Sequence, residues 1–231
     1  MISVIIPTLN EAGPLPGLLA GLTAQGGDHQ IIVADGGSGD GTPEIARGLG
    51  ALVIPAGGGR GGQLHAGARL AAGDIILFLH ADTVFPADGL KRIERVLDAS
   101  PRIVGGNFRV VFDGSSPFAR WLTRFYGWLR RRGVYYGDSA IFVRRAHLDE
   151  IGGIRPIALM EDYDLTRRLQ KSGPTQCIEE VPVITSSRRF EGRWPPAIVI
   201  GWLKIHALYH LGVSPARLAL LYKSTGGRGR S

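Results

Sequence analysis

Short apolar runs alternate with helical segments along the first half of this chain. The runs are rich in Ile, Val and Leu, and the strands that they predict are 2–7, 30–35, 51–54 and 75–79. The segments between them have the spacing and the boundaries of helices, which we expect at 15–23, 43–49, 63–71 and 90–99. Strand–helix alternation with short connections is typical of a parallel, doubly wound sheet. The first half therefore predicts an α/β fold.

The second half continues this pattern less regularly. Strands are expected at 105–112, at the end of 135–143 and at 177–185, and helices at 116–132 and 163–171. Residues 197–222 are apolar but interrupted by charged residues, histidines and a proline, which favours a helix pair. The length fits one domain over 1–190, a helical extension over 191–225 and a disordered glycine–arginine tail over 226–231.

Two of the expected strands end in a carboxylate. The run before Asp82 has no polar alternation, so it predicts a strand buried on both faces, and the second strand ends at Asp35. Ligands of open α/β sheets bind outside the carboxyl ends of the strands, where a carboxylate is a suitable ligand for a divalent cation. Asp82 fits this role, or equally the capping of a turn. Together the two carboxylates can flank one nucleotide-binding crevice.

Two further segments each have a functional and a structural interpretation. The glycine-rich run 57–62 contains Arg60 and precedes a helix, which suits a phosphate group. It matches neither a Walker loop nor a dinucleotide fingerprint, so a mobile glycine loop is a near-equal alternative. Glu161 and Asp162 stand together where a loop enters a helix. They suit either helix capping or a general base with an orienting carboxylate.

Composition narrows the partner and the compartment. A formal net charge of +7 indicates an anionic partner, such as nucleotide phosphates or an anionic membrane surface. No nucleic acid is expected, because the basic residues form no recognisable binding motif. The single cysteine excludes an internal disulfide framework and suits a reducing compartment. Without a signal-peptide pattern or an apolar stretch of bilayer length, we expect a cytoplasmic protein.

Four motifs, taken in order, make the chain similar to the family 2 inverting glycosyltransferases, which have the GT-A fold. The motifs are Ser3-Val4-Ile5-Ile6-Pro7-Thr8-Leu9-Asn10-Glu11, Ile32-Val33-Ala34-Asp35-Gly36-Gly37-Ser38-Gly39-Asp40-Gly41-Thr42, Ala72-Gly73-Asp74-Ile75-Ile76-Leu77-Phe78-Leu79-His80-Ala81-Asp82 and Glu161-Asp162-Tyr163-Asp164-Leu165-Thr166-Arg167-Arg168-Leu169. The resemblance spans most of residues 1–190. It implies a Rossmann-like, mixed and mainly parallel sheet flanked by helices.

The resemblance also implies roles for individual residues. The donor nucleotide sugar would be bound by Pro7, Thr8, Asn10, Glu11, Asp35, Gly36, Arg60, Gly61 and Ala81. Asp82 would bind Mg²⁺ or Mn²⁺, Asp162 would deprotonate the acceptor, and Glu161 would orient the loop or the acceptor. A less specific acceptor-side segment contains Tyr136, Gly137 and Asp138, followed by Arg144 and Arg145.

Two departures from the family pattern qualify these roles. His80 replaces the first acid of the Asp-x-Asp motif, so a cation would rely on Asp82, substrate phosphates and water. The Gln-x-x-Arg-Trp motif of processive synthases is reduced to Arg193 and Trp194, which favours a single transfer. The chain ending, 188–218, is loosely similar to a small bacterial subfamily named for arsenosugar-biosynthesis neighbourhoods.

The activity implied is a single sugar transfer from a nucleoside diphosphate sugar, by default a UDP sugar, to a small-molecule or lipid-linked hydroxyl acceptor. A sugar-phosphate nucleotidylyltransferase and a non-catalytic nucleotide-binding or membrane-interaction module are the alternatives. For 197–222, packing on the domain or a homodimer contact is favoured over peripheral contact with the inner face of a membrane.

Overall fold

Seven strands form one mixed sheet in the part of the chain that the computed structural model describes, residues 1–187 and 194–225. Their order across the sheet is β3 (Leu52–Pro55), β2 (His29–Asp35), β1 (Ile2–Thr8), β4 (Ile75–Phe78), β6 (Ile141–Arg144), β5 (Gly105–Phe112) and β7 (Thr175–Thr185). Strand β6 is antiparallel to both of its neighbours, and the other adjacent pairs are parallel. The predicted mixed, mainly parallel sheet is confirmed.

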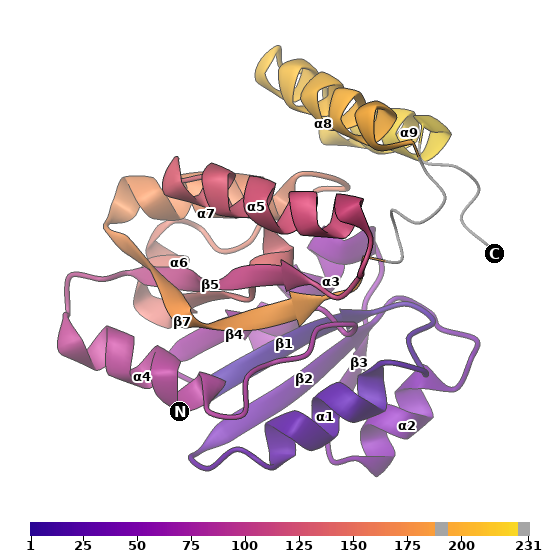
Figure 1. The fold of residues 1–231 in the computed structure, drawn as a ribbon. Coiled ribbons are helices and arrows are strands. Elements are labelled where there is room, and N and C mark those ends of the chain that lie inside the picture. Colours follow the sequence, from indigo (N-terminus) through magenta and orange to yellow (C-terminus); the bar gives the residue numbers. More distant parts are fainter. Residues whose placement is uncertain (188–193, 226–231) are drawn as a thin grey trace.

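Helices cover both faces of this sheet (Figure 1). One face carries α1 (Leu15–Thr23), α2 (Thr42–Gly48), α4 (Gly89–Ala99) and α5 (Pro117–Arg131). The other carries α3 (Gly59–Leu70), α6 (Arg145–Glu150) and α7 (Glu161–Ser172). A short 3-10 turn, η1 (Gly137–Ser139), precedes β6, and α8 (Pro195–His210) and α9 (Pro215–Thr225) lie above α5 and α7. The sequence did not predict α6.

The two-sided core follows the alternation of side chains along the central strands. In β1, Val4 packs in the cluster beneath α1 and α4, whereas Ile5 packs in the cluster beneath α3 and α7. Leu77 and Phe78 of β4 divide in the same way. Because both strands lie inside the sheet, burial on both faces requires an apolar run without polar alternation. The prediction for the strand before Asp82 is confirmed.

The C-terminal helices pack onto the domain through a separate apolar cluster. Its buried members are Met160 and Tyr163 beside the start of α7, Ile205 of α8 and Leu218 of α9. Packing on the domain, one of the interpretations of this segment, is therefore observed. The expected domain boundary at 190 and the expected tail 226–231 lie outside the described residues. None of the described helices combines the length and the apolar content that crossing a bilayer requires.

The glycine-rich run is only partly a loop. Helix α3 begins at Gly59, so residues 59–62 form its first turn instead of leading into a helix that starts at Gln63. Glycine has a low helix propensity, which is why the sequence predicted a later start. The correction matters for the site because it places Arg60 on a helix, in its first turn.

Gly67 lets α3 approach β1 closely. A Cβ at this position would lie 2.5 Å from Cγ2 of Ile5, well inside van der Waals contact. We expect Gly67→Ala to displace α3 and to lower the free energy of unfolding by about 1–3 kcal/mol, as overpacking does. In α1, a Cβ at Gly17 would meet nothing within 4 Å, so Gly17→Ala is the control and should gain about 0.5–1 kcal/mol. Urea denaturation measures both, and equal stability of the two variants would contradict the close approach.

Candidate active site

The loops that follow β1 and β2 are joined by hydrogen bonds. The backbone N–H of Asn10 donates to Oγ of Ser38 at 2.8 Å, and Oδ1 of Asn10 accepts from the N–H of Gly39 at 2.9 Å. The N–H of Glu11 donates to Oγ1 of Thr42 at 2.9 Å. These two loops therefore form one wall at the edge of the sheet where α/β proteins bind nucleotides.

Asp35 is buried, and its carboxylate is fully used inside this wall. Oδ1 accepts from the hydroxyls of Thr8 (3.0 Å) and Ser38 (2.5 Å), and Oδ2 accepts from the N–H groups of Gly37 and Ser38 (both 2.9 Å). Burial opposes ionisation, but these hydrogen bonds outweigh it and hold the pKa of Asp35 below its ordinary value. A carboxylate has about four lone-pair sites. Asp35 therefore shapes the loop, and its contact with a nucleotide base stays a prediction.

Gln63 of α3 joins the same edge. Its Nε2 donates to the carbonyl oxygens of Thr8 (2.6 Å) and Ala34 (2.8 Å), so one buried amide bridges the ends of β1 and β2. Gly36 lies against this amide, because a Cβ there would be 3.0 Å from Nε2. No sequence pattern predicts this role of Gln63, since its partners are backbone carbonyls that only the fold brings near.

The other expected donor-side residues lie along the same edge. Pro7 is partly buried near the end of β1, Gly61 is buried in the first turn of α3, and Ala81 is buried directly after β4. The structure thus brings the predicted donor-side residues to one edge of the sheet.

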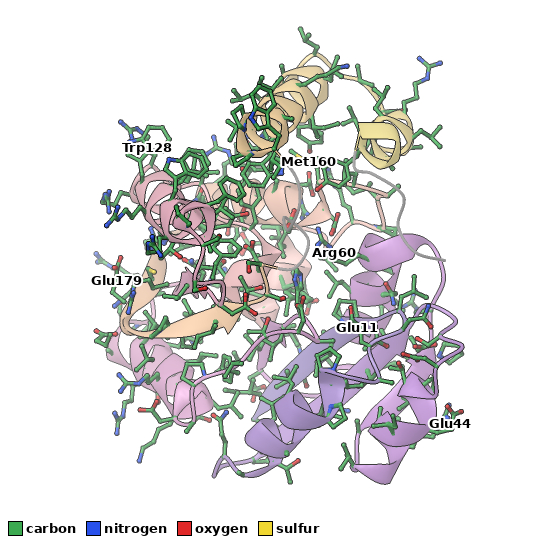
Figure 2. The ribbon with its side chains drawn as sticks, turned by 45° about the vertical axis from the view of Figure 1, so that its right-hand side comes forward. Glu11, Glu44, Arg60, Trp128, Met160 and Glu179 are labelled. Atoms are coloured by element: carbon green, nitrogen blue, oxygen red, sulfur yellow. The ribbon has the colours of Figure 1, made fainter. Side chains whose placement is uncertain are left out.

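Arg60 links the first turn of α3 to the first turn of α7. Its Nε donates to Oε1 of Glu161, and its Nη2 lies 3.4 Å from Oδ2 of Asp162. Figure 2 shows Arg60 between the labelled Glu11, on the donor-side wall, and Met160, which directly precedes α7. The sequence predicted a diphosphate contact for Arg60 and missed this ion pair, whose acidic partner Glu161 is 101 residues away along the chain.

Asp162 is held ionised by its surroundings. Its burial opposes ionisation, but the charge of Arg60 and two backbone hydrogen bonds outweigh this effect, so the pKa of Asp162 lies below its ordinary value. The N–H of Gly137 donates to Oδ2 at 2.9 Å, and the N–H of Tyr163 donates to Oδ1 at 2.7 Å. The nearby positive charge of His80 contributes further. An ionised and oriented carboxylate can accept a proton from a hydroxyl placed against it.

Glu161 has the opposite electrostatic character although it is adjacent. Burial raises the pKa of Glu161 above its ordinary value, and the negative charge of Asp162 adds to this effect, whereas Arg60 offsets only part of it. The same two carboxylates raise the pKa of Arg60, which stays charged. Glu161 is therefore suited to hold Arg60, and Asp162 is the stronger candidate for the base.

The expected acceptor-side segment meets this carboxylate at Gly137. A Cβ at Gly137 would lie 2.8 Å from Nε2 of His80 and 3.3 Å from Oδ2 of Asp162, so only glycine fits without movement. His80, which stands where the family motif has its first acid, therefore lies beside Asp162. Tyr136 and Asp138, the neighbours of Gly137, line the cavity described below.

Backbone strain is concentrated at the same place. Among the described residues, positive φ occurs outside glycine at Asn10 (56°), Ala140 (52°) and Met160 (69°). Asn10 belongs to the donor-side wall, Ala140 follows η1, and Met160 directly precedes Glu161. Residues other than glycine adopt this conformation at a cost, and such strain is common at functional sites.

Asp82 lies half-buried in a turn after β4, and the N–H of Thr83 closes that turn on the carbonyl of His80 at 3.2 Å. Strands β2 and β4 lie on either side of β1 and are parallel to it. Asp35, at the end of β2, and Asp82, after β4, therefore lie at the same edge of the sheet. Within residues 1–187 and 194–225, no group of three or more His, Cys, Asp or Glu side chains is arranged to hold a metal ion. Asp82 therefore fits a cation that is held by one carboxylate together with diphosphate oxygens and water, which is a common arrangement for Mg²⁺.

Arg144 and Arg145 lie away from this site. In the antiparallel pair of β6 and β4, Arg144 is the partner of Ile75, at the amino end of β4. The guanidinium of Arg144 donates to the carbonyl of Ile103 (2.9 Å), and that of Arg145 donates to the carbonyl of Gly73 (2.7 Å). The sequence-based assignment of these arginines to the acceptor side is wrong, because they satisfy backbone carbonyls at the opposite end of the strand.

A cavity of about 440 Å³ adjoins the two carboxylates. Its polar end is formed by Arg60, His80, Asp138, Glu161 and Asp162. The remaining wall is mostly apolar and aromatic and comes from α5, α7 and α8, together with the segments that flank α7 and Tyr222 of α9. The sequence did not predict this cavity, because its walls are assembled from helices far apart in the chain.

The Glycosyl transferase family 2 model matches residues 3–152. The chain is similar to a PGL/p-HBAD biosynthesis glycosyltransferase from Mycobacterium tuberculosis (40% identical over 102 residues, 40% of each chain). It is also similar to an uncharacterized glycosyltransferase from the same species (32% identical over 111 residues, 48% of this chain and 50% of the relative). The chain thus spans half or less of the length of these curated relatives.

Solved structures share the fold. They include a mannosyltransferase from Pyrobaculum calidifontis in complex with GDP-Man and Mn²⁺ (TM-score 0.67, 18% identity, 97% of this chain and 70% of that chain). Another is glucosyl-3-phosphoglycerate synthase from Mycobacterium tuberculosis, solved with Mn²⁺ and UDP (TM-score 0.59, 19% identity, 100% and 81%). A third is S. aureus TarS with UDP-GlcNAc (TM-score 0.61, 18% identity, 81% and 58%). The fold is that of the GT-A glycosyltransferases.

Glu161 should make the protein less stable as the pH rises. Its pKa in the folded state is raised above the ordinary value of 4.5, so between these two values the folded state binds more protons than the unfolded state. Stability must then fall as the pH increases through this window. Glu161→Gln cannot titrate, so we expect the free energy of unfolding of the wild type, minus that of the variant, to decrease over the same window. Urea denaturation at a series of pH values measures this difference, and a difference that rises with pH would contradict the raised pKa.

Proposed function

The chain belongs to glycosyl transferase family 2, and from that membership we propose that it transfers one sugar from a nucleoside diphosphate sugar, by default a UDP sugar, to a hydroxyl acceptor. The observation that carries the proposal is Asp162, an oriented carboxylate with a lowered pKa at the end of a cavity. The donor-side loops lie at the carboxyl edge of β1 and β2, and Arg60 lies between these loops and the start of α7. Donor and acceptor therefore have separate places that meet at this carboxylate.

In this mechanism Asp162 accepts the proton of the acceptor hydroxyl while that oxygen attacks the anomeric carbon. The new carbon–oxygen bond forms on the face opposite the leaving nucleoside diphosphate, so the configuration inverts. The N–H groups of Gly137 and Tyr163 fix the orientation of the Asp162 carboxylate, so less entropy is lost when the productive geometry forms. Glu161 acts indirectly, by holding Arg60 beside the base.

Two groups are proposed to stabilise the departing diphosphate. Arg60 has five N–H donors, and its contacts with Glu161 and Asp162 engage Nε and Nη2. Its remaining donors suit phosphate oxygens. A divalent cation at Asp82, Mg²⁺ or Mn²⁺, supplies electrostatic stabilisation of the developing charge when it is bound. The Mn²⁺ in two structures that share the fold supports this choice of ion.

The rival activities predict different products. A nucleotidylyltransferase would release pyrophosphate, and a non-catalytic module would bind a donor without turnover. The carboxylate of Asp162, oriented by two backbone hydrogen bonds, supports the transferase. The looser resemblance to the arsenosugar-associated subfamily stays a prediction, as do single transfer and a cytoplasmic location. So does contact of the outward face of α8 and α9 with a membrane or a second copy, for which Leu211 and Leu220 (79% and 70% exposed) offer apolar surface.

Asp162→Asn should abolish the proposed base without disturbing the donor side. We expect kcat for UDP release to fall by about 10²–10⁴, the usual contribution of a general base, while the Kd for UDP stays within about twofold. Asp164→Asn is a control in the same turn of α7, because Asp164 is also buried but pairs with Arg155 (3.1 Å) and Arg168 (2.7 Å). It should lower Tm and retain kcat. Equal loss of UDP binding and of turnover in Asp162→Asn would overturn the base assignment.

A thermal-shift panel of UDP, GDP, TDP, CDP and ADP, each with and without Mn²⁺ or Mg²⁺, tests the donor side. Ligands that bind only the folded state raise its Tm by mass action. We expect one diphosphate, by default UDP, to give a metal-dependent increase, and Mn²⁺ alone to give none, because Asp82 needs the diphosphate oxygens as co-ligands. Asp82→Asn should remove only the metal-dependent part. No response to any diphosphate would contradict the donor site.

A further inference from the structure

We propose that the acceptor carries its reactive hydroxyl on an uncharged, apolar body, such as an alkylated aromatic ring or a polyprenyl chain. This inference rests on the proposed transferase function, which places the hydroxyl at Asp162. It concerns the rest of the 440 Å³ cavity, a volume within the range of about 300–1,000 Å³ that is usual for small-molecule sites.

The wall beyond the carboxylates is mostly apolar. Phe125 and Leu129 of α5 form part of it, and Trp202, Leu203 and Ile205 of α8 form another part. A sugar acceptor has several hydroxyl groups that would lose hydrogen bonds to water against such a wall without replacement. An apolar body has no such hydrogen bonds to lose, and its binding is favoured because its surface is removed from water.

Two tyrosine hydroxyls of the aromatic part of the wall are paired with histidines of α8. The hydroxyl of Tyr136 lies 2.9 Å from Nε2 of His206, and the hydroxyl of Tyr163 lies 3.1 Å from Nε2 of His210. Tyr163 and His206 also pack edge to face, with ring centroids 4.9 Å apart. Burial, together with the charge of His210, lowers the pKa of His206, which suits a wall without charge. These groups hold α8 against α7 and do not favour a polar ligand.

The charged end of the cavity disfavours an anionic acceptor. The residues that line it, as far as the structure describes them, include the carboxylates Asp138, Glu161 and Asp162, the guanidinium of Arg60 and the imidazole of His80. Arg60 is already bound to two of these carboxylates. A phosphorylated or carboxylated acceptor would therefore compete with Glu161 and Asp162 for Arg60, whereas a neutral hydroxyl compound would not.

A row of stacked aromatic side chains on α5 includes one residue of the cavity wall. Phe125, which lines the cavity, is stacked between Trp121 and Trp128 on α5, with ring centroids 4.9 and 5.8 Å away. Trp121 also stacks on Phe118, and the guanidinium of Arg132 covers Trp128 at 3.8 Å. Figure 2 shows Trp128 on the outer side of α5. Trp121, Phe125 and Trp128 thus each have a neighbouring group on both ring faces. This row of stacked rings offers ring edges to an apolar chain and no open ring face to a sugar.

Binding of phenylnaphthylamine, a neutral apolar fluorophore, to the full chain tests this class of acceptor. We expect saturable binding that octylphenol displaces and that maltose and phosphoglycerate do not. Octylphenol should also accelerate UDP release from the UDP sugar by at least about tenfold over water as the acceptor. A polyprenol in phosphatidylcholine vesicles provides a second source of the same chemistry. Acceleration by the vesicles alone would assign the acceptor to a membrane lipid, and acceleration by octylphenol in solution would assign it to a soluble compound.

Two variants of α8 provide a matched comparison. Leu203 lines the cavity and is 64% exposed, whereas Ile200 is 61% exposed and is not among the described residues that line it. Because both side chains are already in contact with water, neither change should unfold the chain. Leu203→Gln should weaken octylphenol binding by about fivefold or more, and Ile200→Gln should leave it unchanged. UDP binding should be unaltered in both.

The outcomes separate this inference from the proposed function. UDP binding and slow UDP-sugar hydrolysis, combined with displacement or acceleration by maltose or phosphoglycerate and not by octylphenol, would overturn the apolar acceptor and leave the transferase standing. Equal effects of Leu203→Gln and Ile200→Gln would place the probe outside the cavity and would also overturn the inference. Failure of UDP itself to bind would contradict the transferase.

Discussion

The ion pair between Arg60 and the adjacent carboxylates Glu161 and Asp162 is the constraint on which this site depends. Two neighbouring carboxylates in a buried turn repel each other and lose hydration, so they require a compensating charge. Arg60 supplies it from the first turn of α3. The two acids nevertheless differ, because burial raises the pKa of Glu161, whereas Arg60 and two backbone hydrogen bonds outweigh burial and lower that of Asp162. Removing the guanidinium would remove the charge balance.

The same ion pair connects the two functional halves of the fold. Helix α3 belongs to the donor side, where Gln63 bridges β1 and β2, whereas α7 supports the cavity and the C-terminal helices. Gly137 completes the connection because its N–H binds Asp162 and its lack of a side chain admits His80. The carboxylate of Asp162 is therefore held by contacts from α3, from η1 and from its own helix, and His80 lies beside it. If Asp162 is the proposed base, a proton acceptor held this way needs little reorganisation when a hydroxyl arrives.

The sequence predicted those features that depend on neighbouring residues. Apolar runs located the strands, and the acids that follow them placed Asp35 and Asp82 at one edge of the sheet. It did not predict the features that depend on contacts between distant segments. Gly59 starts a helix despite its low propensity, and the partner of Arg60 is 101 residues away. Arg144 and Arg145 resembled an acceptor-side motif, but Arg144 ends β6 opposite the start of β4 and Arg145 begins α6, so both lie at the far end of the sheet. No local pattern contains that information.

The extent of the family match separates the loops at the strand ends from the cavity. The family model matches residues 3–152, which include the donor-side wall, Arg60 and Asp82. Asp162 and the α8 side of the cavity, including Trp202 and Leu203, lie beyond the match. Donor binding places the same demand on every member that uses a nucleotide sugar, whereas acceptors differ. Under the proposed function, the apolar wall contributed by α8 would therefore set the choice of acceptor, and its chemistry would favour a hydroxyl on an apolar body over a sugar.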